Sequence, residues 1–247
     1  SLVEYGSFDL ETAQEEHQRL EQGKKRAKPS DFISKLPEGK STFRILPPAA
    51  GQRTPFYVHY EHRLTVGGNF SRCVCPSMEM EEFCPACQQA KKLMGSRNEI
   101  DRRQGKALFA KRRVMCNVID RSNEAAGPRI WAFGPSIHDK LIELRTDEDL
   151  GGNYTHPTEG FDIVVIRSGQ ELDTEYNVVR KPNKSPLSTN AQQASEWLGG
   201  MHDLRRLVKV PGQDEIIAMM QGQKIEKAED GYSSPSKNAQ ERLYGKE

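Results

Sequence analysis

Long hydrophobic runs are absent from this sequence, and hydrophobic residues are scarce overall. No apolar stretch approaches the roughly 20 residues that a membrane-spanning helix needs, so we expect no membrane partner. Hydrophobic residues make up 35% of the 247 residues and aromatic residues 7%, which predicts a modest core and long loops. The opening residues lack the charged and apolar segments of a secretory signal, and we therefore expect a cytoplasmic protein.

Cysteine is also sparse outside one short segment. Of five cysteines, four lie between Cys73 and Cys87, and only Cys116 stands apart. This clustering excludes a secreted disulfide scaffold, and it favours a reducing compartment in which the cluster holds metal. Cys116 falls inside a predicted strand with no histidine near it in sequence, so we expect a buried thiol rather than a nucleophile.

Net charge is nearly absent, at +1 for the whole chain, but the charge is unevenly distributed. Residues 91–113 contain nine Lys and Arg against two acidic residues, whereas residues 145–159 are net acidic. The sequence therefore describes a bipolar molecule with one strongly cationic segment, which indicates a polyanionic partner.

The strongest motif lies just before that segment. One histidine and three cysteines follow the spacing H-x12-C-x8-C-x2-C, at His62, Cys75, Cys84 and Cys87. One imidazole and three thiolates are the ligands of a tetrahedral structural Zn²⁺ site, and soft sulfur favours zinc over other ions. Because all four positions are filled by protein, we expect one structural zinc ion with no open position for a substrate.

Two alternatives to this ligand set stay open from the spacing alone. Cys73 could replace Cys75, and His59 could replace His62. We favour Cys75 because it is followed by proline, as Cys84 is, so that both would open similar metal-binding turns. We favour His62 because His59 falls inside a strand pattern.

The hydrophobic pattern predicts a mainly β fold with some helices. We expect strands at 41–46, 56–64, 110–120, 129–133, 161–167 and 174–181. We expect helices at 8–22, 84–95, 136–144, 191–208 and 214–220, and a mobile loop at 96–106. A small set of strands with an early insertion is typical of an OB-fold barrel, here with an inserted zinc-binding subdomain and peripheral helices.

We expect the chain to have three parts. Residues 1–40 form an N-terminal helix and basic linker. Residues 41–210 form the OB-fold core, with the zinc subdomain at about 62–95. Residues 211–247 form a short helix and a flexible C-terminal tail.

A metal-stabilised lobe beside a cationic segment favours single-stranded nucleic acid as the ligand. Such a ligand needs basic groups for its phosphates and aromatic rings for its bases. The candidate contacts are Arg44, Arg63, Phe70, Lys111, Arg112, Arg113, Trp131 and Tyr176.

Several of these segments together resemble the single-stranded DNA-binding, helix-destabilising proteins of T-even-type bacteriophages. The resemblance runs from about Thr42 to Val179. The segments that carry it are Phe43–Pro47, Pro55–Phe56, the His62 and cysteine set, Lys111–Arg113, Asn117–Ile119, Trp131–Gly134, Ile137–Leu141 and Ser168–Gly169.

The resemblance implies an OB-fold with a zinc subdomain and DNA in a cleft between them. It implies that Lys111–Arg113 and the aromatics Phe70, Trp131 and Tyr176 lie at that cleft, in a protein of the infected host's cytoplasm. It also implies cooperative self-association through a basic N-terminal segment, for which Lys24–Lys28 is the counterpart.

The sequence departs from this family at two places. Val114 and Met115 stand where an aromatic pair is expected, so stacking should be weaker or placed elsewhere. The family's acidic C-terminal tail, which recruits replication and recombination proteins, has no counterpart in residues 222–247, where acidic and basic residues are mixed.

We therefore expect a sequence-nonspecific single-stranded DNA-binding protein of phage replication and recombination, and no enzyme. An RNA-binding translational regulator using the same groove is the main alternative, and a protein–protein scaffold is another. A zinc-dependent nuclease or deaminase is disfavoured. His59-Tyr60-Glu61 has the His-x-Glu form of a deaminase, but an extra cysteine, Cys75, fits a closed site better.

Overall fold

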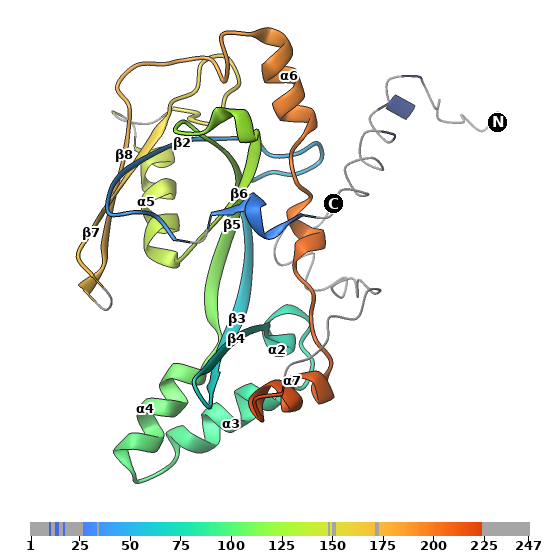
Figure 1. The fold of residues 1–247 in the computed structure, drawn as a ribbon, viewed down its shortest axis with the longest axis vertical. Helices are drawn as coiled ribbons and strands as arrows, with labels where there is room; N and C mark the ends of the chain where they lie inside the picture. The colour runs from blue at the N-terminus through green and yellow to red at the C-terminus, as the bar shows by residue number, and fades with distance from the viewer. Residues whose placement is uncertain are drawn as a thin grey trace, which may run out of the picture. The chain divides into compact units, whose positions relative to one another are not determined.

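The chain divides into two compact units. The computed structural model describes residues 27–33, 35–147, 149, 152–170 and 173–223, with the single residues 10, 13, 14 and 17 (Figure 1). Unit 1 comprises residues 1–49, 116–131 and 140–204, and unit 2 comprises residues 50–115, 132–139 and 205–247. Most of the predicted helix at 8–22, most of the basic segment Lys24–Lys28 and the tail beyond 223 lie outside the described residues; the four described residues of 8–22 are helical.

Strands and short helices alternate along the described chain. The strands are β1 (Phe32–Ile33), β2 (Gly39–Ile45), β3 (Tyr57–Val66), β4 (Asn69–Val74), β5 (Lys111–Asp120), β6 (Pro128–Phe133), β7 (Ile163–Ser168) and β8 (Glu175–Arg180). The α-helices are α2 (Pro76–Glu79), α3 (Pro85–Met94), α4 (Glu99–Leu108), α5 (Pro135–Thr146), α6 (Ala191–Gly199) and α7 (Gln213–Met220). Short 3₁₀ helices are η1 (Pro29–Asp31), η2 (Glu124–Ala126) and η4 (Leu204–Leu207). None of these helices combines the length and the apolar character that would let it span a membrane.

The eight described strands belong to one sheet. Their order is β1-β6-β5-β2-β7-β8, and β3, paired with β4, joins the sheet at β5. Strand β5 takes part in both units, because Lys111–Met115 pair with β3 and Val118–Asp120 pair with β2. This mixed architecture agrees in coarse terms with the predicted β fold with helices. Among the described strands the two ends of the path, β1 and β8, do not pair, so the sheet is not closed.

Unit 1 is built on an apolar core. Phe43 of β2 and Trp131 of β6 are each 1% exposed, and their ring centroids lie 4.9 Å apart. Leu46, Ile119, Leu187 and Trp197 form a neighbouring buried cluster. Alternating side chains of the strands supply the first group, and α6 covers the second through Trp197.

Most predicted elements are confirmed within a few residues. The predicted strand 56–64 is β3, the predicted helix 84–95 is α3, and the predicted hairpin at 161–181 is β7 and β8. Strand β4 was missed, because its residues Asn69–Val74 lie inside the cysteine-rich segment that we interpreted as an insertion. The predicted helix 191–208 ends at Gly199 and is followed by η4.

The prediction of a mobile loop at 96–106 is wrong, because most of this segment is helix α4. The Asn98 side chain caps the helix by accepting from the Ile100 N–H at 2.9 Å. Gly105 is buried against α3, where an added Cβ would lie 2.9 Å from the Ala90 carbonyl oxygen. The segment was not predicted as a helix because it is rich in charged residues and has no apolar stripe. Its stabilising contacts are instead a side-chain cap and one close approach to α3.

Candidate metal centre and basic sheet face

Four side chains of unit 2 converge as the spacing predicted. The ligand atoms of His62, Cys75, Cys84 and Cys87 all lie within 4.8 Å of one another. His62 Nε2 lies 3.3 Å from Cys84 Sγ and 3.6 Å from Cys87 Sγ, and the Sγ atoms of Cys75 and Cys87 are 3.5 Å apart. This cluster, which we call the metal centre, could hold one metal ion.

Two Cys-Pro turns present the sulfurs. Cys75 precedes α2 and Cys84 precedes α3, and in both helices proline fills the first position, where no N–H is needed. Cys87 follows in the first turn of α3, so the Cys84-Pro-Ala-Cys87 segment directs two sulfurs to one point. The repeated Cys-Pro pattern thus coincides with two helix starts, of which only that of α3 was predicted.

His62 is fixed from behind by α4. The carbonyl oxygen of Leu108, at the end of α4, accepts a hydrogen bond from His62 Nδ1 at 2.7 Å. This hydrogen bond leaves Nε2 free to face the sulfurs, in the arrangement that metal-bound histidines usually show. This contact could not be predicted from the sequence, because its acceptor is a backbone atom 46 residues away.

The three thiols of the metal centre shift one another's pKa values. A hydrogen bond from the Cys75 thiol lowers the pKa of Cys84 to about 4, and the same interaction raises the pKa of Cys75. Burial raises the pKa of Cys87. Protons therefore have to be shared among the crowded sulfurs, whereas a divalent cation would allow all three to be thiolates.

The two alternatives to the ligand set are resolved. Cys73 is buried beside the metal centre but does not belong to it, and burial raises the pKa of its thiol to about 12. His59 instead faces Glu61, with 3.7 Å between Nε2 and Oε2. The cluster that could hold an ion therefore contains Cys75 and His62, and neither Cys73 nor His59 belongs to it.

Few apolar side chains surround the metal centre. Its buried neighbours form a cluster of six residues, Leu64, Cys73, Cys75, Cys84, Ala86 and Ile216, of which three are cysteines. Ile216 comes from α7, so a segment more than 120 positions further along the chain completes the cluster. Such a small apolar core gives the lobe little stability of its own.

The opposite face of the same sheet carries basic and aromatic side chains. Side chains alternate along a strand, so Arg63 of β3 points away from the side on which His62 and Leu64 meet the metal centre. In β4, Arg72 lies directly opposite Arg63, and Phe70 lies opposite Thr65. We call this side of β4, β3 and β5 the basic sheet face.

The exposed part of this face combines cations with a ring. Phe70 is 56% exposed, and the Arg72 guanidinium lies 5.3 Å from its centroid. Arg63 and Lys111 are exposed as well. Two arginines placed opposite each other repel, and a bound anion would relieve that repulsion.

A buried carboxylate anchors two of the arginines. Glu61 Oε1 lies 3.7 Å from Arg72 Nε and 3.5 Å from Arg113 Nε. Burial alone would raise the pKa of Glu61, but the interaction with His59 and the charges of Arg72 and Arg113 outweigh it, and the pKa is lowered. Glu61 is therefore ionised and holds Arg72 and Arg113 in place.

Three predicted contacts therefore lie on the exposed part of unit 2 as proposed, namely Arg63, Phe70 and Lys111. Arg112 is half-buried and pairs with Asp139 at 2.6 Å. Arg113 is only 9% exposed, because it packs beside Glu61. Arg72 and Glu61 were missed, although the alternation of β3 and β4 could have placed Arg72 opposite Arg63 had β4 been recognised.

Two other predicted contacts are corrected, because they are interior residues of unit 1. Arg44 is 1% exposed, and its Nε donates to Asp162 at 3.0 Å. Arg44 thus points from β2 at this buried carboxylate rather than at solvent. Trp131 is 1% exposed against Phe43. Tyr176 of β8 is half-buried in unit 1.

Comparison with known proteins adds no relative: no protein-family model and no curated protein matches this chain.

Proposed function

We propose that this chain binds single-stranded DNA without sequence preference, using the basic sheet face of unit 2. The observation that carries the proposal is the side-by-side placement of Phe70, Arg72 and Arg63 on an exposed sheet surface. Aromatic rings stack on bases and guanidinium groups bind phosphates, so such a face meets both needs of an unpaired strand.

The metal that we propose for the metal centre is Zn²⁺. Three sulfurs and one imidazole in a buried, four-ligand set suit its tetrahedral preference. Bound there, the ion would serve as a structural cross-link among β3, α2 and α3, with no open position for catalysis. Because β3 supplies both His62 and Arg63, the ion would stabilise the strand that presents the proposed DNA contacts.

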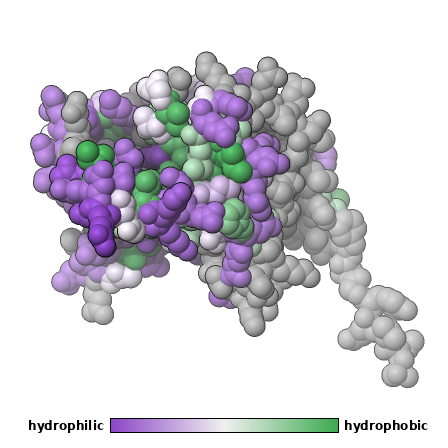
Figure 2. All heavy atoms as spheres, turned by 90° about the horizontal axis from the view of Figure 1, so that it is seen from below, coloured by the Kyte–Doolittle hydropathy of each residue, from purple (hydrophilic) through white to green (hydrophobic). Residues whose placement is uncertain are grey.

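The charge of unit 2 supports the same ligand. Residues 50–115 contain twelve Lys and Arg against six Asp and Glu. In Figure 2, which views the molecule from below with respect to Figure 1, hydrophilic residues surround small hydrophobic patches. Phosphate binding releases condensed counterions, so affinity should fall steeply as salt rises.

The resemblance to phage helix-destabilising proteins supports a role in coating exposed strands during replication and recombination, on a sheet of partly open OB type. Preferential binding to the unpaired strand would open duplex DNA by mass action, with no reaction catalysed.

Titration of fluorescein-labelled oligo-dT, followed by anisotropy at low and high salt, tests the proposal. Trp131 and Trp197 are only 1% and 5% exposed, so the label reports binding more directly than protein fluorescence. We expect saturable binding that weakens with salt, similar binding of oligo-dA, and weaker binding of the duplex. Lack of binding at low salt would refute the proposal, and a marked preference for matched RNA would replace DNA with RNA as the ligand.

A further inference from the structure

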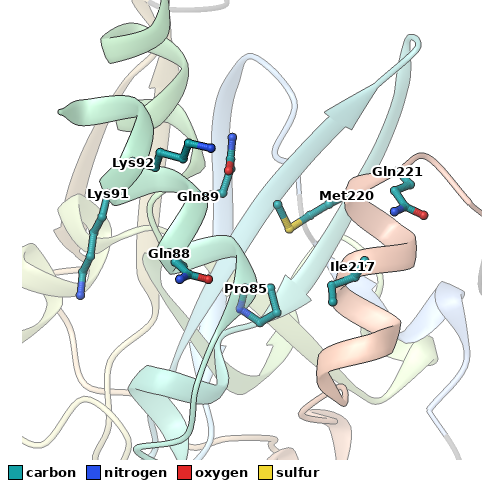
Figure 3. A pocket seen from close by; sticks show the side chains of 8 residues that line it. All are labelled: Pro85, Gln88, Gln89, Lys91, Lys92, Ile217, Met220 and Gln221. Carbon is teal, nitrogen blue, oxygen red and sulfur yellow. The ribbon is translucent and has the colours of Figure 1, made fainter. Parts of the chain in front are cut away.

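A groove separates α3 from α7 on unit 2. Its main part is a cavity of about 840 Å³ between the two helices (Figure 3). A second cavity of about 450 Å³ shares Gln89 and Met220 with it and continues toward β3 and α4. The two cavities together form one elongated groove rather than a compact pocket, which favours an extended ligand over a small molecule.

We propose that this α3–α7 groove binds an acidic, amphipathic peptide segment of a partner protein. The charge of its lining is one-sided: it includes Lys91, Lys92 and Arg63, and no Asp or Glu is among the described residues that line it. The two acidic residues of α7 lie in its first turn, where Glu215 accepts from the Gly212 N–H at 2.8 Å. Charge complementarity therefore selects a negative ligand.

The floor of the groove is apolar. Pro85 of α3 faces Ile217 and Met220 of α7, while Lys92 and Gln89 stand on the α3 side (Figure 3). Ile217 is 42% exposed although it adjoins a buried core. Apolar side chains of a peptide would cover this floor, and its carboxylates would meet the lysines at the rim.

A nucleic-acid strand suits the groove less well than a peptide does. Single-strand sites use aromatic side chains as stacking platforms. Among the described residues that line the two cavities there is no aromatic one; glutamine, lysine and aliphatic residues predominate. The groove and the basic sheet face thus differ in chemistry, although Arg63 lies at the border of both. The peptide proposal rests on Lys91, Lys92 and the apolar floor, and it does not depend on DNA binding.

The chain's own C-terminal segment is a poor match for the groove. Residues 224–247 follow α7 directly, but they contain five acidic and five basic residues. A segment with balanced charge gains little from a cationic groove. Residues 224–247 are therefore not the expected ligand.

The test uses a fluorescein-labelled peptide in which Asp-Glu pairs alternate with Leu pairs, titrated with the zinc-loaded full chain and followed by anisotropy. We expect saturable binding that Lys92→Glu weakens about tenfold. Ile217→Asp should weaken it to a similar extent. Lys106→Glu, an equal charge change on exposed α4 outside the groove, is the matched control and should bind as the wild type does. A peptide with Ser in place of Leu should bind poorly.

Three results would overturn the proposal. One is equal weakening by Lys92→Glu and Lys106→Glu, because the attraction would then be non-specific. Another is displacement of the peptide by oligo-dT together with weakened DNA binding of Lys92→Glu, which would assign the groove to nucleic acid. The third is peptide binding only by a chain that ends at Gln223, which would make the natural tail the occupant. Peptide binding by a protein that fails to bind oligo-dT would refute the proposed DNA function and leave the groove proposal standing.

Discussion

The two units are held together by different means. Unit 1 buries large apolar side chains such as Phe43, Trp131 and Trp197, and its deepest charges, Arg44 and Asp162, neutralise each other. The part of unit 2 around the metal centre is different, because half of its buried cluster is cysteine. We therefore expect the stability of the metal-centre region to depend on metal coordination and that of unit 1 on apolar burial. Each should respond to a different perturbation.

Metal removal should separate the two units most strongly. Structural zinc contributes roughly 10 kcal/mol or more to small zinc domains, so a chelator or Cys84→Ala should unfold unit 2 around the metal centre. Trp131 and Trp197 both belong to unit 1, and their fluorescence should change little while zinc content and DNA binding are lost. Cys73→Ala, which removes a buried thiol outside the ligand set, should retain the zinc. Full zinc retention by Cys84→Ala would contradict the ligand assignment.

Asp162→Asn should have the reverse effect. Arg44 and Arg121 both donate to Asp162 at about 3 Å, so the substitution leaves a buried guanidinium without its anion. Removing one partner of such a pair costs about 3–5 kcal/mol. Chemical unfolding followed by tryptophan fluorescence should show this loss, with zinc content unchanged. Asp139→Asn, which breaks the more exposed pair with Arg112, is the matched control and should change stability little.

The same carboxylate makes unit 1 acid-sensitive. Burial alone would raise the pKa of Asp162, but the hydrogen bonds and charges of Arg121 and Arg44 outweigh it and lower the pKa below its ordinary value. A lowered pKa means stability that is present above the unfolded pKa and is lost as pH falls through the folded one. Unfolding free energy measured from neutral pH down to about pH 3 should therefore decline more steeply in the wild type than in Asp162→Asn. Equal slopes would show that other acids control the transition.

Phe70→Ala should affect binding and leave both units folded. The ring is 56% exposed, so little stability depends on it. Loss of one stacking platform costs about 1–3 kcal/mol of single-strand affinity, measurable with labelled oligo-dT. Phe83→Ala provides a matched control, because Phe83 is 51% exposed between α2 and α3, outside the basic sheet face. Equal losses from the two substitutions would remove Phe70 from the proposed DNA site.

The smallest expected effect is on α4. Asn98→Ala removes the side-chain cap of this helix and should cost about 1 kcal/mol. Thermal unfolding of unit 2, followed by far-UV circular dichroism, should register the change, whereas unit 1 should unfold as before. Asn190→Ala, at the corresponding cap of α6, should instead lower the stability of unit 1 and leave the unfolding of unit 2 unchanged.

The metal centre was predictable because its information is local. Cysteine spacing and two Cys-Pro pairs identify Cys75, Cys84 and Cys87, and strand alternation separates His62 from His59. Arg44 and Trp131 were misassigned for a reason that the sequence hides: both neighbours that bury them, Asp162 and Phe43, lie far away along the chain. Alternation tells which side of a strand a residue occupies, but not which side of the sheet another element covers.

Helix α4 was missed for a related reason. Its charged sequence is typical of a loop. The helix is nevertheless held by the Asn98 cap, by the close approach of Gly105 to α3 and by the hydrogen bond of the Leu108 carbonyl to His62. The last two contacts depend on where α3 and β3 lie, which no local pattern encodes, whereas the Asn98 cap is a local signal that we did not use.

The bond between His62 and the Leu108 carbonyl has one more consequence. It links the imidazole that faces the sulfurs to the end of a ten-residue cationic helix. Loss of the ion at Nε2 should therefore weaken the hydrogen bond that Nδ1 donates to the Leu108 carbonyl. Amide protons of α4 should then exchange with solvent faster once the ion is removed. The supply of metal would in this way set how firmly α4 and its basic residues Arg102, Arg103 and Lys106 are held.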